Sequence, residues 1–99
     1  MNDPKRLAAV VGEMHGCRAA HLRSEPVTER FRGETMWDGV VEVFSITGRG
    51  DATTAYAWTY EGDDGKLHHL AVLGVPPINS PVDAVRAAAV AAAKKGNKV

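Results

Sequence analysis

The chain has 99 residues with 12 basic and 12 acidic side chains, so its formal net charge is zero. A chain of this length forms one domain with a thin core, and 44% hydrophobic residues is ordinary for a globular protein. The sequence lacks a basic footprint for nucleic acid and an apolar run of the roughly 20 residues that span a membrane. We therefore predict a single domain over residues 1–99, with a frayed tail at 96–99, no membrane span and no nucleic-acid partner.

Two further features of the sequence favour a cytoplasmic location. Asp3 and Pro4 precede Lys5 and Arg6, and no long apolar stretch of the kind found in secretory signals follows them. Cys17 is the single cysteine, so an internal disulfide is impossible.

The first predicted element is a helix over residues 4–14. Asp3 is a good N-cap, and Pro4 suits the first helical position because its missing N–H would have no partner there. Apolar residues then recur at helical spacing, and Gly16 is a typical stop.

Four segments have the composition of β-strands. Residues 20–32 contain Pro26, which the middle of a sheet excludes, so this segment is expected to include an exposed edge strand. Three clearer strands, rich in β-branched and aromatic residues, are predicted over 37–47, 53–60 and 67–75. Glycine- and aspartate-rich turn clusters separate these three strands, which makes an antiparallel meander the simplest topology.

The C-terminal helix has the strongest local signal in the sequence. Ser80 is a capping residue type, Pro81 suits the first helical position, and Asp83 lies near the positive end of the helix dipole. A helix is predicted over about residues 81–95. The fold class is therefore α+β, with an antiparallel meander of three to four strands between an N-terminal and a C-terminal helix.

Side-chain alternation divides the predicted sheet into two faces. Tyr56, Trp58 and Tyr60 form an aromatic row on one face, whereas Ala55 and Ala57 lie on the other. We expect the alanine-rich C-terminal helix to pack closely on this small-residue face.

The other two clear strands are apolar on both faces, unlike strands of a sheet with one wet face. If the two helices leave one apolar face of the sheet exposed, another chain, a ligand or the N-terminal segment must bury it. We favour a second copy of the chain, and hence a homodimer. The alternative is that the helices split, one to each face.

Metal-ligand residue types occur at His15, Cys17 and His21. Their spacing matches no zinc pattern and a fourth ligand is not evident, so we predict no metal and no cofactor. His68 and His69 do not act as a pair, because adjacent strand residues point to opposite faces.

Glu42 is the one weak candidate for catalysis. It shares a strand face with Phe44 and Ile46, and a carboxylate on an apolar face has a raised pKa, which suits a general acid. The alternative is that Glu42 pairs with an arginine or a histidine, or lies at a wet edge. No catalytic motif accompanies it.

Two resemblances bear on the fold. The segments WDGVVEVF (37–44) and AYAW (55–58), with Pro76-Pro77 and Ser80-Pro81 further on, resemble a group of short uncharacterised bacterial proteins over roughly residues 27–90. That resemblance implies a fold but no activity. The element order is similar to the double-stranded-RNA-binding domain in topology only, because the second helix here begins with Ser80-Pro81 rather than with a lysine cluster, so RNA binding is not expected.

The sequence therefore predicts a non-enzymatic binding or interaction domain that self-associates through its sheet. The residues expected at a ligand or interface surface are Phe44, Tyr56, Trp58, Tyr60 and His69. The alternative is a small enzyme or small-ligand binder, with a pocket between sheet and helix lined by Glu42, His69, Tyr56 or Trp58. The partner is expected to be a second copy, another protein or a small molecule.

Overall fold

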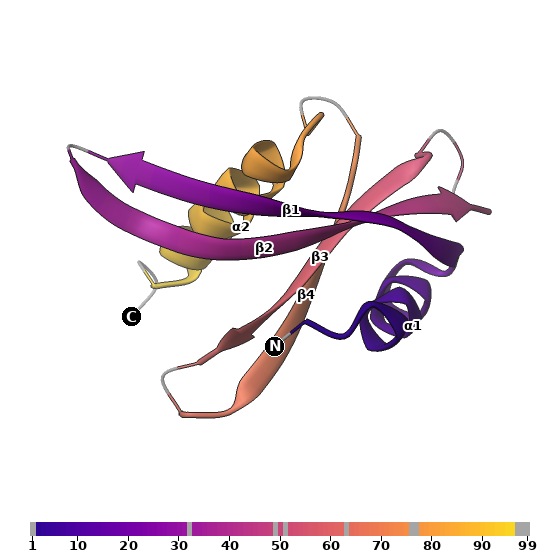
Figure 1. Cartoon of the computed structure of the whole chain (residues 1–99), viewed down its shortest axis with the longest axis horizontal. Helices are drawn as coiled ribbons and strands as arrows, with labels where there is room; N and C mark the ends of the chain where they lie inside the picture. Colours follow the sequence, from indigo (N-terminus) through magenta and orange to yellow (C-terminus); the bar gives the residue numbers. More distant parts are fainter. Residues whose placement is uncertain are drawn as a thin grey trace.

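The structure, a computed structural model, describes residues 2–31, 33–48, 50, 52–62, 64–75 and 78–96. Its elements are α1 (Pro4–His15), β1 (Arg18–Phe31), β2 (Glu34–Thr47), β3 (Thr54–Glu61), β4 (Leu67–Leu73) and α2 (Pro81–Gly96). The strands form one antiparallel sheet in the order β1-β2-β3-β4 (Figure 1). The predicted α+β meander is confirmed, with the first strand at the edge. Except for Gly96, the tail predicted at 96–99 lies outside the described residues.

α1 begins at the predicted residue and ends at His15, one residue beyond the predicted bound, with the predicted N-cap and the predicted stop at Gly16. Asp3 accepts hydrogen bonds from the N–H groups of Lys5 and Arg6 at 3.1 and 3.4 Å. Gly16 has a φ of 63° and donates its N–H to the carbonyl of Gly12 at 2.9 Å. A residue with a Cβ is strained at this positive φ, so glycine suits the end of the helix.

Two hydrogen bonds of Asp83 fix the start of α2. The Asp83 N–H donates to the Ser80 hydroxyl at 3.2 Å, and the Asp83 carboxylate accepts from the Asn79 N–H at 3.1 Å. The first bond satisfies an N–H group that the first turn of a helix leaves without a partner, and the second ties the residue before the cap to the helix. Neither α1 nor α2, over their described residues, is long and apolar enough to cross a membrane.

The two helices cover opposite faces of the sheet (Figure 1). The core on the α1 side consists of Leu7, Val11, Phe44, Ile46, Ala52, Ala55, Ala57 and Ala71. The core on the α2 side consists of Val27, Val41, Val43, Tyr56, Trp58, Ala84 and Val85. The alternative in which the helices split, one to each face, is therefore the arrangement found.

The alanine-rich helix packs on the face opposite to the one that we predicted. Tyr56 and Trp58 lie under the small side chains of α2, including Ala84, while Ala55 lies under the larger side chains of α1, including Leu7. Packing to uniform density favours a large side chain opposite a small one. The prediction was wrong because it placed small residues against small residues.

β1 contains one residue more than its ladder with β2 requires. The register shifts between His21 and Arg23, so Leu22 is the extra residue of a β-bulge. In an unbroken strand His21 and Ser24, three positions apart, would point to opposite faces. The bulge places both on the face of Glu42.

β2 and β3 are paired over only part of their length. Their ladder runs from Glu42 opposite Ala57 to Ser45 opposite Thr54, although β2 starts well before Glu42 and β3 continues to Glu61. Beyond this ladder the β1–β2 and β3–β4 hairpins diverge (Figure 1). We call the space between the diverging parts of β2 and β3 the fork.

Candidate functional site

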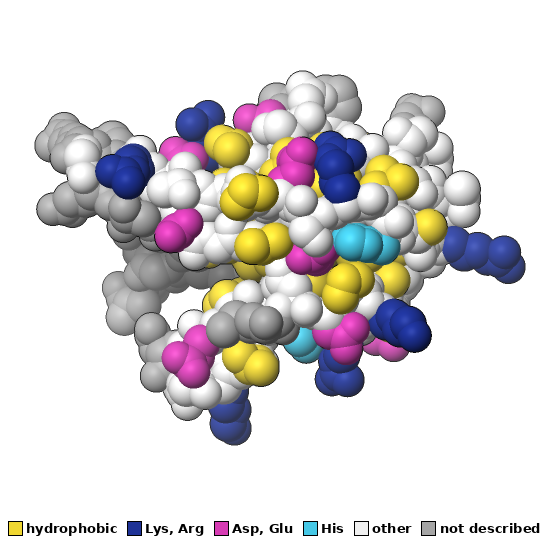
Figure 2. Space-filling view, viewed as in Figure 1, with side chains coloured by type: hydrophobic (Ala, Val, Ile, Leu, Met, Phe, Trp, Pro, Cys, Tyr) yellow, Lys and Arg dark blue, Asp and Glu magenta, His cyan; other side chains and the backbone are white. Residues whose placement is uncertain are grey.

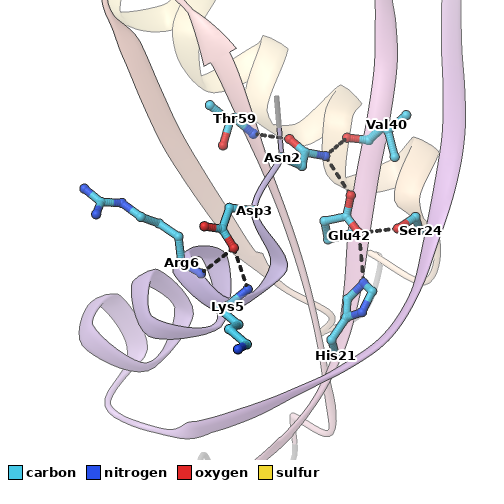
Figure 3. A network of polar contacts seen from close by, with 9 residues as sticks. All are labelled: Asn2, Asp3, Lys5, Arg6, His21, Ser24, Val40, Glu42 and Thr59. Carbon is cyan, nitrogen blue, oxygen red and sulfur yellow. Dashed lines mark hydrogen bonds and ion pairs between the residues drawn. The ribbon is translucent and has the colours of Figure 1, made fainter.

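Glu42 is the centre of a polar network at the root of the fork (Figure 3). Its side chain is only 3% exposed, and it accepts hydrogen bonds from three side chains. His21 Nε2 lies 2.8 Å from Oε1, and Asn2 Nδ2 lies 2.8 Å from Oε2. The Ser24 hydroxyl also donates to Oε1. The network therefore joins the segment before α1 to both strands of the first hairpin.

The raised pKa that we predicted for Glu42 is wrong. Burial raises this pKa, but the hydrogen bonds from Ser24, Asn2 and His21, together with the charge of His21, lower it by more. The pKa of Glu42 consequently lies below its ordinary value, and the carboxylate is ionised at neutral pH. Glu42 pairs with a histidine, as the alternative interpretation held, and a carboxylate without a proton is a poor general acid.

The arrangement of these side chains differs from that of a catalytic triad. In a triad the histidine stands between the hydroxyl and the carboxylate, so that it can take the proton of the nucleophile. Here the carboxylate of Glu42 stands between His21 and Ser24 and accepts from both. The base that Ser24 faces is therefore a carboxylate whose pKa is lowered, which is a weaker base than a histidine.

The three side chains that we considered as metal ligands each contact a different partner. His15 Nε2 is 3.2 Å from the carbonyl of Ala71, and Cys17 Sγ is 3.8 Å from the carbonyl of Val11. His21 instead binds Glu42. Within the described ranges, no three histidine, cysteine or acidic side chains are grouped closely enough to hold a metal ion.

Asn2 spans the fork with its carboxamide. Its Oδ1 accepts from the Thr59 N–H at 2.9 Å, and its Nδ2 donates to the Val40 carbonyl at 2.7 Å (Figure 3). At the other end of the β2–β3 ladder, the Ile46 N–H donates to the Thr53 carbonyl, so Ile46 and Thr53 form a hydrogen-bonded pair. In an antiparallel ladder such pairs recur at every second residue of each strand. The same register makes Val40 and Thr59 the next such pair beyond the ladder. The carboxamide is thus inserted into the hydrogen bond that the two strands would otherwise make.

A cleft of about 550 Å³ opens outward from Asn2 between the two strands. Its walls are residues 37–40 of β2 and residues 59–61 of β3, and Glu42 closes its root. We call it the fork cleft. Figure 2 shows a hollow between the two hairpins with acidic side chains on both sides of it. A smaller cavity of about 260 Å³ adjoins it on the α2 side.

Gly39 leaves room for the indole ring of Trp37, which lies over it in the same strand. A Cβ at Gly39 would be 2.9 Å from an atom of the Trp37 ring. The half-buried Trp37 ring meets the ring of the buried Trp58 edge-on, with centroids 5.8 Å apart at 66°. Trp37 therefore joins the cleft wall to the core under α2.

The structure places the residues predicted at a ligand or interface surface in three environments. Phe44, Tyr56 and Trp58 are buried in the two cores. Tyr60 is 37% exposed and lines the fork cleft. His69 is half-buried, with Nδ1 2.9 Å from the Thr59 hydroxyl oxygen. Glu42 and Tyr60 therefore meet at one site, whereas the remainder of the aromatic row does not reach it.

Sequence reasoning missed Asn2, Ser24 and Trp37 as residues of this site. The position of Asn2 before a capping aspartate carries no signal for a bridge between two distant strands. Ser24 faces Glu42, but a prediction of that contact requires the strand register. The pair formed by Trp37 and Gly39 was the one readable signal, because a glycine two positions from an aromatic residue in a strand leaves room for its ring.

Comparison of the chain with protein-family models, with curated proteins and with solved structures finds no match. The resemblance to short bacterial proteins stays a prediction.

Replacing Asn2 by alanine is expected to destabilise the fold by about 1–3 kcal/mol, because the Thr59 N–H and Glu42 both lose a partner near the fork root. Urea unfolding measures this loss, with Lys5→Ala on the exposed side of α1 as the control. Amide hydrogen exchange gives a site-specific signal, since the Thr59 N–H should lose protection in Asn2→Ala alone. Unchanged exchange at Thr59 would contradict the bridge.

Glu42 makes the stability depend on pH in the acid range. Its folded-state pKa lies below the ordinary 4.5, so its stabilising contribution is complete above that pH and is lost as the pH falls through the folded value. Glu42→Gln is expected to lack this part of the acid loss. The pKa of Asp64 is also lowered, chiefly by the hydrogen bond from the Lys66 N–H. The contribution of Glu42 is therefore the difference between the acid losses of the wild type and of Glu42→Gln. Urea midpoints between about pH 2 and 7 that fall equally in both would contradict the assignment.

Proposed function

We propose that this chain is a binding domain without catalytic chemistry of its own, and that it holds an extended polypeptide segment in the fork cleft. The observation that supports the proposal is the carboxamide of Asn2, which occupies one rung between β2 and β3. A carboxamide has the donor and the acceptor of a peptide group. The backbone groups facing the fork therefore suit peptide groups.

The strand edges on both sides of the fork continue outward from that rung. The alternation that directs the backbone of Val40 and Thr59 into the fork also directs that of Asp38 and Glu61 there. Pro26 agrees with this pattern. It lies opposite Val40, and because the backbone groups of Val40 point into the fork, the two residues form a non-hydrogen-bonded pair. The Pro26 nitrogen therefore points to the outer edge of β1, where the sheet needs no N–H. An extended segment in the fork would meet a backbone donor and a backbone acceptor on β2 and on β3, as in the addition of a peptide to a sheet edge.

The alternative of a small enzyme has less support from this site. Catalytic acid and base pairs have environments that push their pKa values apart. The buried carboxylate at the root of the fork, Glu42, is instead held ionised by three donors. The volume of the cleft is within the range of small-molecule pockets, so a small ligand is an outcome that the test below distinguishes.

Self-association through the sheet stays a prediction, as does a cytoplasmic location. Tyr56 and Trp58 contribute little to a surface, because they lie under α2. Light scattering decides between a dimer and a monomer, since the chain mass is 10.6 kDa.

Selection from a displayed library of random decapeptides tests the proposed function, with the affinity of each selected peptide measured by fluorescence anisotropy. Glu61→Pro removes one N–H that faces the fork. It removes no hydrogen bond of the sheet, because the bond from the Gly62 N–H to Lys66 makes Glu61 and Leu67 a non-hydrogen-bonded pair. Glu61→Gln, which keeps the N–H and lacks the charge as the proline variant does, is the matched control.

Selected peptides are expected to bind Glu61→Pro about tenfold more weakly than Glu61→Gln, the effect of one lost hydrogen bond. Failure to select any peptide would overturn the proposal. Equal affinity for the two variants would also overturn it. Selection of small molecules but no peptides from a parallel screen would favour the small-ligand alternative.

A further inference from the structure

The fork cleft has two rims of different chemistry. Continuing the β2–β3 register places Asp38 opposite Glu61, with both side chains on the α1 side of the sheet. Trp37 and Tyr60 are each one position away in the same strands, so they lie on the α2 side. Carboxylates therefore form one rim, and aromatic rings form the other.

No lysine or arginine of the described residues lines the cleft beside the carboxylate rim. Asp38 is exposed and accepts a hydrogen bond from the Thr28 hydroxyl at 2.9 Å, a neutral donor. Glu61 is exposed on the opposite bank. Because the ring of His21 is bonded to Glu42 at the root, with Nε2 2.8 Å from Oε1, the rim presents negative charge to whatever enters the cleft.

The aromatic rim leads into the smaller cavity of about 260 Å³. Trp37 and Tyr60 line both spaces, and apolar residues of α2 such as Val85 form the far wall. Among the described residues that line this cavity, Glu29 carries the one carboxylate, and it is paired with Arg86 at 3.1 Å. This side of the fork therefore suits an apolar side chain.

We propose that the segment held in the fork alternates basic and apolar residues, an inference that rests on the proposed function. Side chains of an inserted strand point alternately to its two faces. One set would meet the carboxylates of Asp38 and Glu61. The other set would meet Trp37, Tyr60 and the cavity behind them. The partner is thus an extended protein segment in which basic and apolar residues alternate where it passes through the fork.

Four fluorescein-labelled octapeptides test this inference by anisotropy. Three alternate valine with lysine, glutamine or glutamate, and the fourth has the composition of the lysine peptide in two blocks. The alternating lysine peptide is expected to bind about tenfold more tightly than the glutamine and block peptides, and the glutamate peptide most weakly. The advantage of lysine over glutamine should shrink as salt is raised from about 0.02 to 0.15 M.

In the double variant Asp38→Asn/Glu61→Gln, the lysine and glutamine peptides are expected to bind within about twofold of each other. Glu13→Gln removes an exposed carboxylate of α1 outside the cleft, and it should keep the full preference. Equal binding of the lysine and glutamine peptides to the wild type would overturn the charge inference and leave the proposed function standing. Equal binding of the block peptide would overturn the two-rim arrangement. If none of the four peptides binds, this inference falls, and the library selection decides the proposed function.

Discussion

Replacing Phe44 by alanine is expected to lower the free energy of unfolding by about 3–5 kcal/mol. The Phe44 ring is 0% exposed and packs in the core under α1 with Leu7 and Val11. The ring of His21 lies 5.4 Å from it, so the truncation also removes a support of the Glu42 network. Small domains have total stabilities of about 5–15 kcal/mol, and the loss should therefore be evident in both urea and thermal unfolding.

Phe44→Leu is the matched control, because it keeps an apolar side chain and leaves a smaller cavity, so it is expected to destabilise by less than Phe44→Ala. The experiment also distinguishes a core residue from the interface residue that the sequence suggested. Truncation of an exposed side chain in a monomer changes stability by only about 0.5 kcal/mol. A change of that size in Phe44→Ala would contradict the burial and restore the interface hypothesis.

Replacing Glu42 by alanine is expected to destabilise the fold by about 2–3 kcal/mol, because hydrogen bonds to a charged group contribute more than neutral ones and their donors are left without an acceptor. Asn2, Ser24 and His21 would all lose this acceptor. Glu42→Gln should lie between the wild type and the alanine variant, since its amide keeps one accepting oxygen and lacks the charge. Urea unfolding at neutral pH measures both changes.

Glu13→Ala on the exposed side of α1 is the control for Glu42→Ala, and it should change the stability by less than about 0.5 kcal/mol. A double-mutant cycle between Glu42→Ala and Ser24→Ala adds a test of the contact itself. The two losses should be less than additive, because the Ser24 hydroxyl loses its acceptor in either variant. Additive losses, or a Glu42 variant as stable as the control, would contradict the network.

The order and type of the elements were predictable because their signals are local. Asp3 and Gly16 delimit α1, Ser80 begins α2, and each contact that fixes these ends lies within a few residues of the chain. β1 was predicted less well, over 20–32 rather than Arg18–Phe31. Its dense charges hide the alternation, and its bulge breaks the period.

The arrangement of the site was not predictable, because it depends on contacts between distant residues. The pKa of Glu42 follows from donors at Asn2 and His21, 40 and 21 positions away in the chain. The fork depends on how far β2 and β3 remain paired, which their composition does not indicate. Apolar residues on both faces indicated that both faces are covered, but we favoured a second copy of the chain as one of the covers, whereas the two helices take one face each. Which helix covers each face is decided by side-chain size.

The bulge at Leu22 bears on how the gene for this chain can change in length. β1 sets seven residues, 18–24, opposite the six residues 42–47 of β2, and Leu22 is 54% exposed. Loss of one codon in a strand ordinarily reverses the faces of all residues up to its end. Loss of codon 22 instead leaves an unbroken alternation in which His21 and Ser24 still share a face. Descendants of this gene should therefore tolerate a single-residue deletion there more readily than elsewhere in the strand.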